Sequence, residues 1–381
     1  MLQSGTILNR ATDPVNHPVD EGGTMKIMGV GDTVLARTPG PEASALPLLR
    51  RGDVTIANLE APLVDVDSPT EKEMTIGVPT ATAPLLADLG IDVVSLATNH
   101  ALDHGTEGLL STIEALDAAG VRHAGGGRTL AEAERGTVVE AAGSRGAVLS
   151  FCSTLPPGAN ATTTRPGIAP IRIDQSLALD GITLQEQPGT PPFLRTAAQE
   201  ADVARAEDAI RAARRTADRV VVCLHWGVPW AYLPDNQGPL AQYQQPLGRR
   251  LVDAGADVVI GTHPHCLHPV ERWNDGLILY SAGNFLFHAA EISVPELYFP
   301  LPYQASRLFT GRWFDSAAFE IDLPERGPGR LRLVPITLDA KGEPQVATSD
   351  FAERTLAAFE RDSREIDEMV RLTPDGEVGF G

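Results

Sequence analysis

Short apolar runs alternate with longer helical patterns along most of this chain, and this alternation restricts its fold more than any other feature. The apolar runs are rich in β-branched residues and apolar at nearly every position, which is typical of strands buried on both faces. The predicted strands are residues 26–30, 54–58, 92–96, 147–151, 219–224, 257–261 and 276–280. Helical patterns fill the intervals at 106–119, 197–218 and 239–254. This order of strands and helices predicts a layered α/β domain.

The later part of the chain indicates that the sheets are mixed. Two strand-like runs, 317–323 and 331–336, have no strong helix between them and are predicted to pair antiparallel. An amphipathic helix is predicted at 351–372. We therefore divide the chain into a loosely held N-terminal arm (1–24), one large domain (25–340) and a C-terminal helical tail (341–381). Much of the Pro-rich stretch 156–192 is predicted to form long loops, which in a compact domain are often lids or substrate-binding elements.

Composition excludes several classes of protein. The formal net charge of -19 would repel a phosphate backbone, so no nucleic-acid partner is expected. No run approaches the ~18 apolar residues of a membrane span, and the first residues lack the pattern of a secretory signal. The three cysteines, Cys152, Cys223 and Cys266, form no disulfide framework or metal-binding pair. We expect a cytoplasmic protein without a membrane anchor.

Polar residues with metal-binding side chains follow five of the predicted strands. In open α/β sheets ligands bind outside the carboxyl ends of strands. Each residue alone has a structural alternative, because an Asp after a strand is often a turn former and a single His is often an ordinary hydrogen-bonded residue. Five coincident strand ends instead predict one divalent metal site, since carboxylates, an amide oxygen and imidazoles suit such ions. The predicted ligands are Asp32, Glu60, Asn99, His225, His263 and His265.

Two further groups are candidates for catalysis and substrate binding. His100 is predicted to act as a general acid or base, and Asp103 to orient its ring. The alternative for Asp103 is a cap of the following helix. His263 and His265 flank Pro264. The turn at Pro264 either directs both imidazole rings into one cavity or has no role beyond turning the chain. The candidate substrate-binding residues, for which ordinary packing is the alternative, are Trp226, Trp230, Tyr232 and Asn284.

These motifs resemble the CapA family of capsule-biosynthesis proteins, also called the poly-gamma-glutamate synthesis family, within the calcineurin-like metallophosphoesterases. The matching stretches are GVGDTVLAR (29–37), IANLEAPL (56–63), ATNHALDHG (97–105), VCLHWG (222–227), DAGADVVIGTHPHCLHPVE (253–271) and LYSAGNFLF (279–287). The resemblance implies a four-layer α/β/β/α sandwich with a metal centre at the strand ends. It implies that His100 is the acid–base histidine.

The resemblance also implies how the ligands are shared between two metal positions. The first would take Asp32, Glu60 and His265, and the second Glu60, Asn99, His225 and His263. The phosphoesterase pattern begins Asp-x-His, whereas here Val34 occupies the histidine position, and Glu60 replaces the usual bridging Asp. A binuclear centre would hold Mn, Fe or Zn, and a single oxygen-rich site would hold Ca or Mg.

Three functions follow from the resemblance. The first is metal-dependent epimerisation of the Cα of the C-terminal residue of a ribosomal lasso precursor peptide. In that reaction the pairs His100–Asp103 and His265–Asp32 would serve as base and acid on opposite faces of a peptide substrate. The alternatives are a metal-dependent phosphoester hydrolase and an accessory protein of capsule or poly-gamma-glutamate synthesis.

Overall fold

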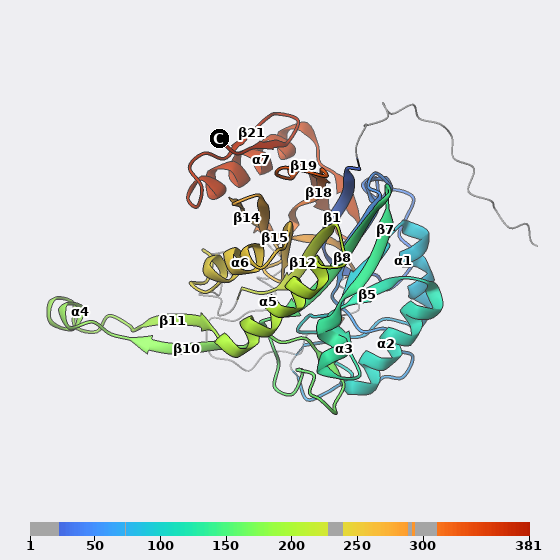
Figure 1. The fold of residues 1–381 in the computed structure, drawn as a ribbon, viewed down its shortest axis with the longest axis horizontal. Coiled ribbons are helices and arrows are strands. Elements are labelled where there is room, and N and C mark those ends of the chain that lie inside the picture. The colour runs from blue at the N-terminus through green and yellow to red at the C-terminus, as the bar shows by residue number, and fades with distance from the viewer. Residues whose placement is uncertain (1–22, 73, 228–238, 289–291, 294–310) are drawn as a thin grey trace, which may run out of the picture.

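Two mixed β-sheets packed face to face form the centre of the protein, and helices cover both outer sides (Figure 1). The computed structural model describes residues 23–72, 74–227, 239–288, 292–293 and 311–381. The first sheet contains ten strands. Eight of them run in the order β21 (Arg371–Leu372), β22 (Glu377–Gly379), β19 (Arg330–Leu338), β18 (Asp315–Leu323), β1 (Met25–Val34), β2 (Val54–Leu59), β4 (Val93–Ser95) and β5 (Arg122–Ala124). In addition, β16 (Asn284–Phe287) pairs with β1 and β20 (Pro344–Val346) pairs with β19.

The second sheet contains six strands. Their order is β14 (Leu267–Trp273), β15 (Gly276–Ala282), β13 (Val258–Thr262), β12 (Arg219–His225), β8 (Ser144–Cys152) and β7 (Thr137–Ala141). Short two-stranded pairs join β3 (Thr75–Ile76) to β17 (Ile292–Ser293) and β6 (Gly126–Gly127) to β9 (Gly167–Ile168). Strands β1, β2 and β4 are parallel in the first sheet, as are β8, β12 and β13 in the second. Parallel strands bring their carboxyl ends to one edge, where the predicted ligands lie.

Three apolar clusters hold the layers together, because each sheet buries both of its faces. One cluster packs the first sheet against α1 (Ala83–Leu89) and α2 (Gly105–Ala119). A second lies between the two sheets and includes part of α7 (Ser349–Arg364). The third packs the second sheet against α5 (Glu200–Arg214) and α6 (Gln244–Asp253). The four-layer α/β/β/α architecture is confirmed.

Several predicted elements have different bounds in the structure. The helix predicted at 197–218 is α5, Glu200–Arg214, because the residues before it form strand β11 (Phe193–Ala198). The helix predicted at 239–254 is α6, Gln244–Asp253. The segment 341–381 contains α7, but also the strands β20, β21 and β22, whose backbones complete the first sheet. The predicted arm at 1–24 lies outside the described residues except for its last two.

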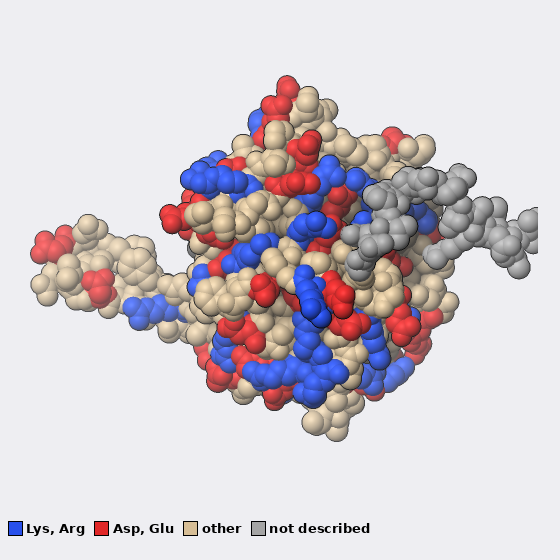
Figure 2. Space-filling model, turned by 45° about the horizontal axis from the view of Figure 1, so that its top comes forward, with Lys and Arg blue, Asp and Glu red and all other residues tan. Residues whose placement is uncertain are grey.

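The stretch 156–192, predicted as long loops, contains part of a two-stranded ribbon. Strand β10 (Ile173–Ala178) pairs with β11 over six residue pairs, and the short helix α4 (Gly181–Glu186) closes its far end. The ribbon projects from the body, and its surface carries few charged side chains (Figures 1 and 2). Whether this stretch acts as a lid or in substrate binding stays a prediction. The base of the ribbon is fastened because the buried Asp202 accepts hydrogen bonds from Arg172 and Arg205.

None of the helices within the described residues has both the length and the apolar character needed to cross a membrane. On the face shown in Figure 2, basic and acidic side chains are interspersed over the body of the protein.

Candidate metal centre

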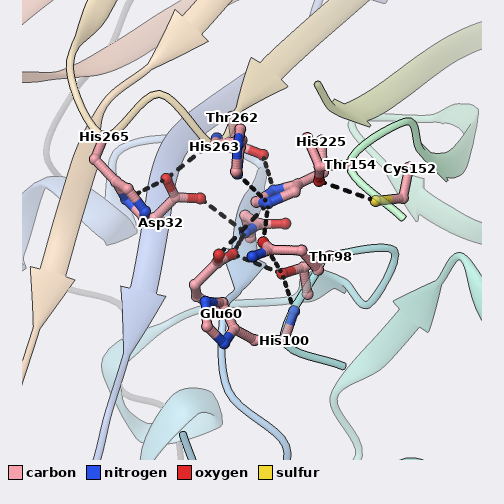
Figure 3. Close-up of polar contacts among 12 residues, drawn as sticks. Asp32, Glu60, Thr98, His100, Cys152, Thr154, His225, Thr262, His263 and His265 are labelled. Atoms are coloured by element: carbon pink, nitrogen blue, oxygen red, sulfur yellow. Dashed lines mark hydrogen bonds and ion pairs between the residues drawn. The ribbon is translucent and has the colours of Figure 1, made fainter. Parts of the chain in front are cut away.

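The predicted ligands come together at the edge where the strands of both sheets end (Figure 3). Asp32 lies near the end of β1, and Glu60 directly follows β2. His225 is the last residue of β12, and His263 directly follows β13. The loop after β4 brings Asn99 to the same place, where its Oδ1 lies 2.7 Å from His225 Nε2. All six predicted ligands, His265 included, therefore belong to one contiguous polar cluster.

The core of this cluster is a carboxylate with two imidazoles. Ligand atoms of Glu60, His225 and His263 all lie within 4.8 Å of one another. The Nε2 of His225 is 3.1 Å from His263 Nδ1 and 3.4 Å from Glu60 Oε1. One imidazole nitrogen carries at most one proton, so hydrogen bonds cannot satisfy all of its close neighbours at once.

This donor set fits a divalent cation. Within the part of the chain that the structure describes, the buried Oε1 of Glu60 has no hydrogen-bond partner, and an unpaired buried carboxylate oxygen is costly. The Nδ1 of His225 lies 3.0 Å from Thr262 Oγ1. If the Nδ1–H donates to Thr262, the Nε2 lone pair points into the cluster, which is how metal-binding histidines are usually held. A cation held by Glu60, Asn99, His225 and His263 would therefore compensate the buried Oε1 of Glu60.

Asp32 and His265 form a second pair beside this core. Asp32 Oδ2 lies 3.0 Å from His265 Nδ1, and Asn58 Nδ2 donates to Asp32 Oδ1 at 2.8 Å and to Glu60 Oε2 at 2.5 Å. Asn58 thus links the two carboxylates. Val34, at the position where the phosphoesterase pattern has histidine, is buried in an apolar cluster and offers no ligand. This side of the site is consequently rich in oxygen donors.

The backbone around these residues is unusually constrained. A Cβ on Gly31 would lie 1.9 Å from the carbonyl oxygen of Gly283, so only glycine allows β1 to approach the turn before β16 this closely. The same carbonyl accepts a hydrogen bond from Asp32 N. His263 and His265 have φ values of 101° and 56°, in a region that side-chain-bearing residues rarely occupy. Such strain gathers at functional sites, where the surrounding structure compensates for it.

Burial shifts the charge states of these side chains. Burial, reinforced by the charge of Asp32, raises the pKa of Glu60 well above its usual value. Burial and the neighbouring imidazoles hold the pKa values of His225 and His263 well below the usual range. The histidines are therefore neutral near pH 7, which is the form that binds metal ions.

His100 and Asp103 form the predicted acid–base pair next to the cluster. His100 Nδ1 lies 2.6 Å from Asp103 Oδ2, and both side chains are buried. The short contact assigns the Nδ1 proton to the hydrogen bond with Asp103 and leaves Nε2 to exchange protons. Burial, together with the charge of Lys72, lowers the pKa of His100 despite the favourable contact with Asp103. His100 is thus a neutral imidazole that can accept a proton.

Of the four predicted substrate-binding residues, two are buried in the structure and two lie outside the described residues. Trp226 is completely buried, its indole N–H donates to the Tyr280 carbonyl, and its ring stacks on that of Tyr280. It belongs to the core, so its expected place in a pocket wall does not agree with the structure. Asn284 is also buried and positions His265, since its Oδ1 lies 2.8 Å from His265 Nδ1. Trp230 and Tyr232 lie outside the described residues.

The structure adds site residues to which sequence reasoning assigned no role. Thr98 donates a hydrogen bond to Glu60 Oε2, Asn58 links the two carboxylates, and Lys72 contacts Asp103. Asn58 and Thr98 lie in the strand-end motifs, which was the available signal. Lys72 lies in a loop, and its only sequence signal is that lysine is rare in this chain. His265 packs against the ring of Trp313, with 4.5 Å between ring centroids.

The chain is similar to known bacterial proteins over most of its length. The family model described as bacterial capsule synthesis protein PGA_cap matches residues 19–289. The capsule biosynthesis protein CapA of Bacillus anthracis is 27% identical over 353 residues, covering 89% of this chain and 73% of that protein. The PGA biosynthesis protein CapA of Bacillus subtilis is 26% identical over 338 residues, covering 88% and 71%. A probable polyglutamine synthesis accessory protein of Mycobacterium tuberculosis is 31% identical over 253 residues, covering 65% and 59%.

Proposed function

The chain belongs to the bacterial capsule synthesis protein family PGA_cap, and from this premise we propose that it is an accessory protein in the synthesis of a capsule-type or polyglutamate-type polymer. In this proposal the site carries out metal-dependent acid–base chemistry on the polymer. The names of the relatives, which refer to capsule, PGA and polyglutamine synthesis, support the biological role. The observation that carries the chemistry is the buried Glu60–His225–His263 cluster beside the His100–Asp103 pair.

The residues divide into those that hold a cation and those that move protons. Glu60, Asn99, His225 and His263 would hold a divalent ion, with Asp32 and His265 beside them. Such an ion would polarise a carbonyl oxygen of an amide-linked substrate. His100 would accept or release a proton at Nε2, because its Nδ1 is engaged with Asp103.

The role can be tested in the bacterium that encodes this chain. Deleting the gene is expected to lower the amount of the polymer or change its length. Wild-type protein should restore the polymer, whereas Glu60→Gln and His100→Gln should not. An unchanged polymer in the deletion strain would refute the accessory role. Full restoration by both variants would refute the chemistry, while the accessory role would remain.

A specific observation also favours a second candidate, epimerisation of a peptide Cα. The site contains two His–Asp pairs, His100–Asp103 at 2.6 Å and His265–Asp32 at 3.0 Å. Epimerisation requires one group to remove the Cα proton and another to deliver a proton to the opposite face. In D2O, a precursor peptide would gain one deuterium at one Cα without loss of residues. Turnover of an aryl phosphate with Mn²⁺ would instead favour phosphoester hydrolysis.

A further inference from the structure

We propose that Lys72 is a positioning residue that fixes the orientation of the His100–Asp103 pair and connects it to the metal cluster. The inference rests on the proposed function, because it assumes that His100 is the group that exchanges protons. It concerns a side chain for which neither the motifs nor the resemblance implies any role.

Lysine is rare in this protein, and one lysine reaches the site. Only Lys26, Lys72 and Lys341 are lysines among the 31 basic residues. The Lys341 side chain is 61% exposed and pairs with Glu42 at the surface. The Lys72 side chain is only 24% exposed, and its Nζ donates to Asp103 Oδ1 at 2.7 Å.

The two oxygens of Asp103 are divided between different partners. Oδ1 accepts from Lys72, whereas Oδ2 accepts from Ile76 N at 2.8 Å and contacts His100 Nδ1 at 2.6 Å. The ammonium therefore restrains rotation of the carboxylate, so that Oδ2 stays within hydrogen-bond distance of His100 Nδ1. Because Asp103 is 1% exposed, water cannot easily replace Lys72 as the partner of Oδ1.

Lys72 also contacts the segment that carries a predicted ligand. Its Nζ donates to the backbone carbonyl of Asn99 at 3.0 Å, and the Asn99 side chain lies 2.7 Å from His225. The Nζ is 3.2 Å from His100 Nδ1, but that nitrogen uses its proton in the shorter contact with Asp103. One ammonium therefore joins the acid–base pair to the backbone of the metal cluster.

The shape of this site suits an ammonium better than a guanidinium. An ammonium is a compact charge whose donors can turn toward two acceptors on different segments, whereas a guanidinium is planar and larger. The loop that carries Lys72 is fastened at another point, where Thr70 N donates to the Asp103 carbonyl at 2.8 Å. This second contact limits how far the loop can shift to admit a longer side chain at position 72.

The test compares Lys72→Met, which removes the charge, with Lys72→Arg, which keeps it, and with Lys341→Met as the matched control. Nitrogen-15 NMR of the full chain reports the His100 Nδ1–H and its exchange with water, and needs no substrate. We expect exchange to be about tenfold faster in Lys72→Met and unchanged in Lys341→Met. For the reaction that the wild type catalyses, kcat should fall about 10- to 100-fold in Lys72→Met with little change in KM, as is typical when a supporting partner is lost.

Lys72→Arg should be intermediate in both measurements, and it decides the question if Lys72→Met does not fold. Wild-type exchange and kcat in either folded Lys72 variant would overturn the inference. Failure of the proposed function would look different: the wild type would show no reaction, while the NMR change in Lys72→Met would still occur. A loss of kcat with unchanged NMR signals would also overturn the positioning role.

Discussion

Removing the metal should destabilise this protein, and the Glu60→Gln substitution should abolish the effect. Glu60 and Asp32 are both 0% exposed, and Asn58 donates hydrogen bonds to both carboxylates. A divalent ion held there stabilises the folded state by about 2.7 kcal/mol at one hundred times its Kd, and by about 4.1 kcal/mol at one thousand times. The entropy of unfolding for this length is about 0.8 kcal/mol per kelvin, so the Tm should rise by about 3–5 °C.

Differential scanning calorimetry of chelator-treated protein, with Mn²⁺, Zn²⁺, Ca²⁺ or Mg²⁺ added in turn, measures this shift. Glu60→Gln should reduce the shift to less than about 1 °C, because it removes the charge that the cation compensates. The matched control is Glu343→Gln, another buried glutamate, which should keep the full shift. The reasoning fails if no cation raises the Tm of the wild type, or if Glu60→Gln responds as the wild type does.

The raised pKa of Glu60 also predicts how the stability of the metal-free protein depends on pH. The folded-state pKa of Glu60 is raised by burial and by Asp32. Its contribution to stability is therefore fully present below the ordinary glutamate pKa and is lost as the pH rises through the folded-state pKa. Metal-free wild type should lose stability over this rise in pH relative to Glu60→Gln, and saturating metal should remove the difference. Parallel pH curves for metal-free wild type and variant would contradict this explanation.

Three other substitutions separate catalysis, packing and anchoring. His100→Gln should lower kcat about 10²- to 10⁴-fold and leave the metal-induced Tm shift intact; equal losses of both would contradict a proton-transfer role. Trp226→Ala should cost about 3–5 kcal/mol in urea unfolding with little effect on KM, since the ring is a core element; a large KM change in a stable variant would restore the pocket interpretation. For Asp202, burial alone would raise the pKa, but hydrogen bonds from Arg172 and Arg205 outweigh it and lower the pKa. Its contribution is thus present above the ordinary Asp pKa and lost as the pH falls through the lowered value. Asp202→Asn should cost about 1–2 kcal/mol at pH 7, after allowing for the partly exposed arginines, and nothing in strong acid, as measured by urea unfolding at both pH values.

Local sequence determined the layered α/β architecture and the set of side chains at the strand ends. Buried strands need continuous apolar runs, and the turn that follows each one is where polar groups can face a site, so both signals are local. For this reason Asp32, Glu60, Asn99, His225 and His263 could be named from the chain alone. The pairing of His100 with Asp103 was also predictable, because these residues are three positions apart.

Contacts between distant segments decided the rest. Asn58 donates hydrogen bonds to the carboxylates of Asp32 and Glu60, and Lys72 contacts Asp103 from a loop 31 residues away in the sequence. No local sequence pattern predicts these contacts. Trp226, which was expected to line a pocket, instead lies in the core because its ring stacks on that of Tyr280, 54 residues later in the sequence. The strands in 341–381 and the ribbon at 173–198 likewise depend on backbone pairing, whose partners are set by the whole fold rather than by neighbouring residues.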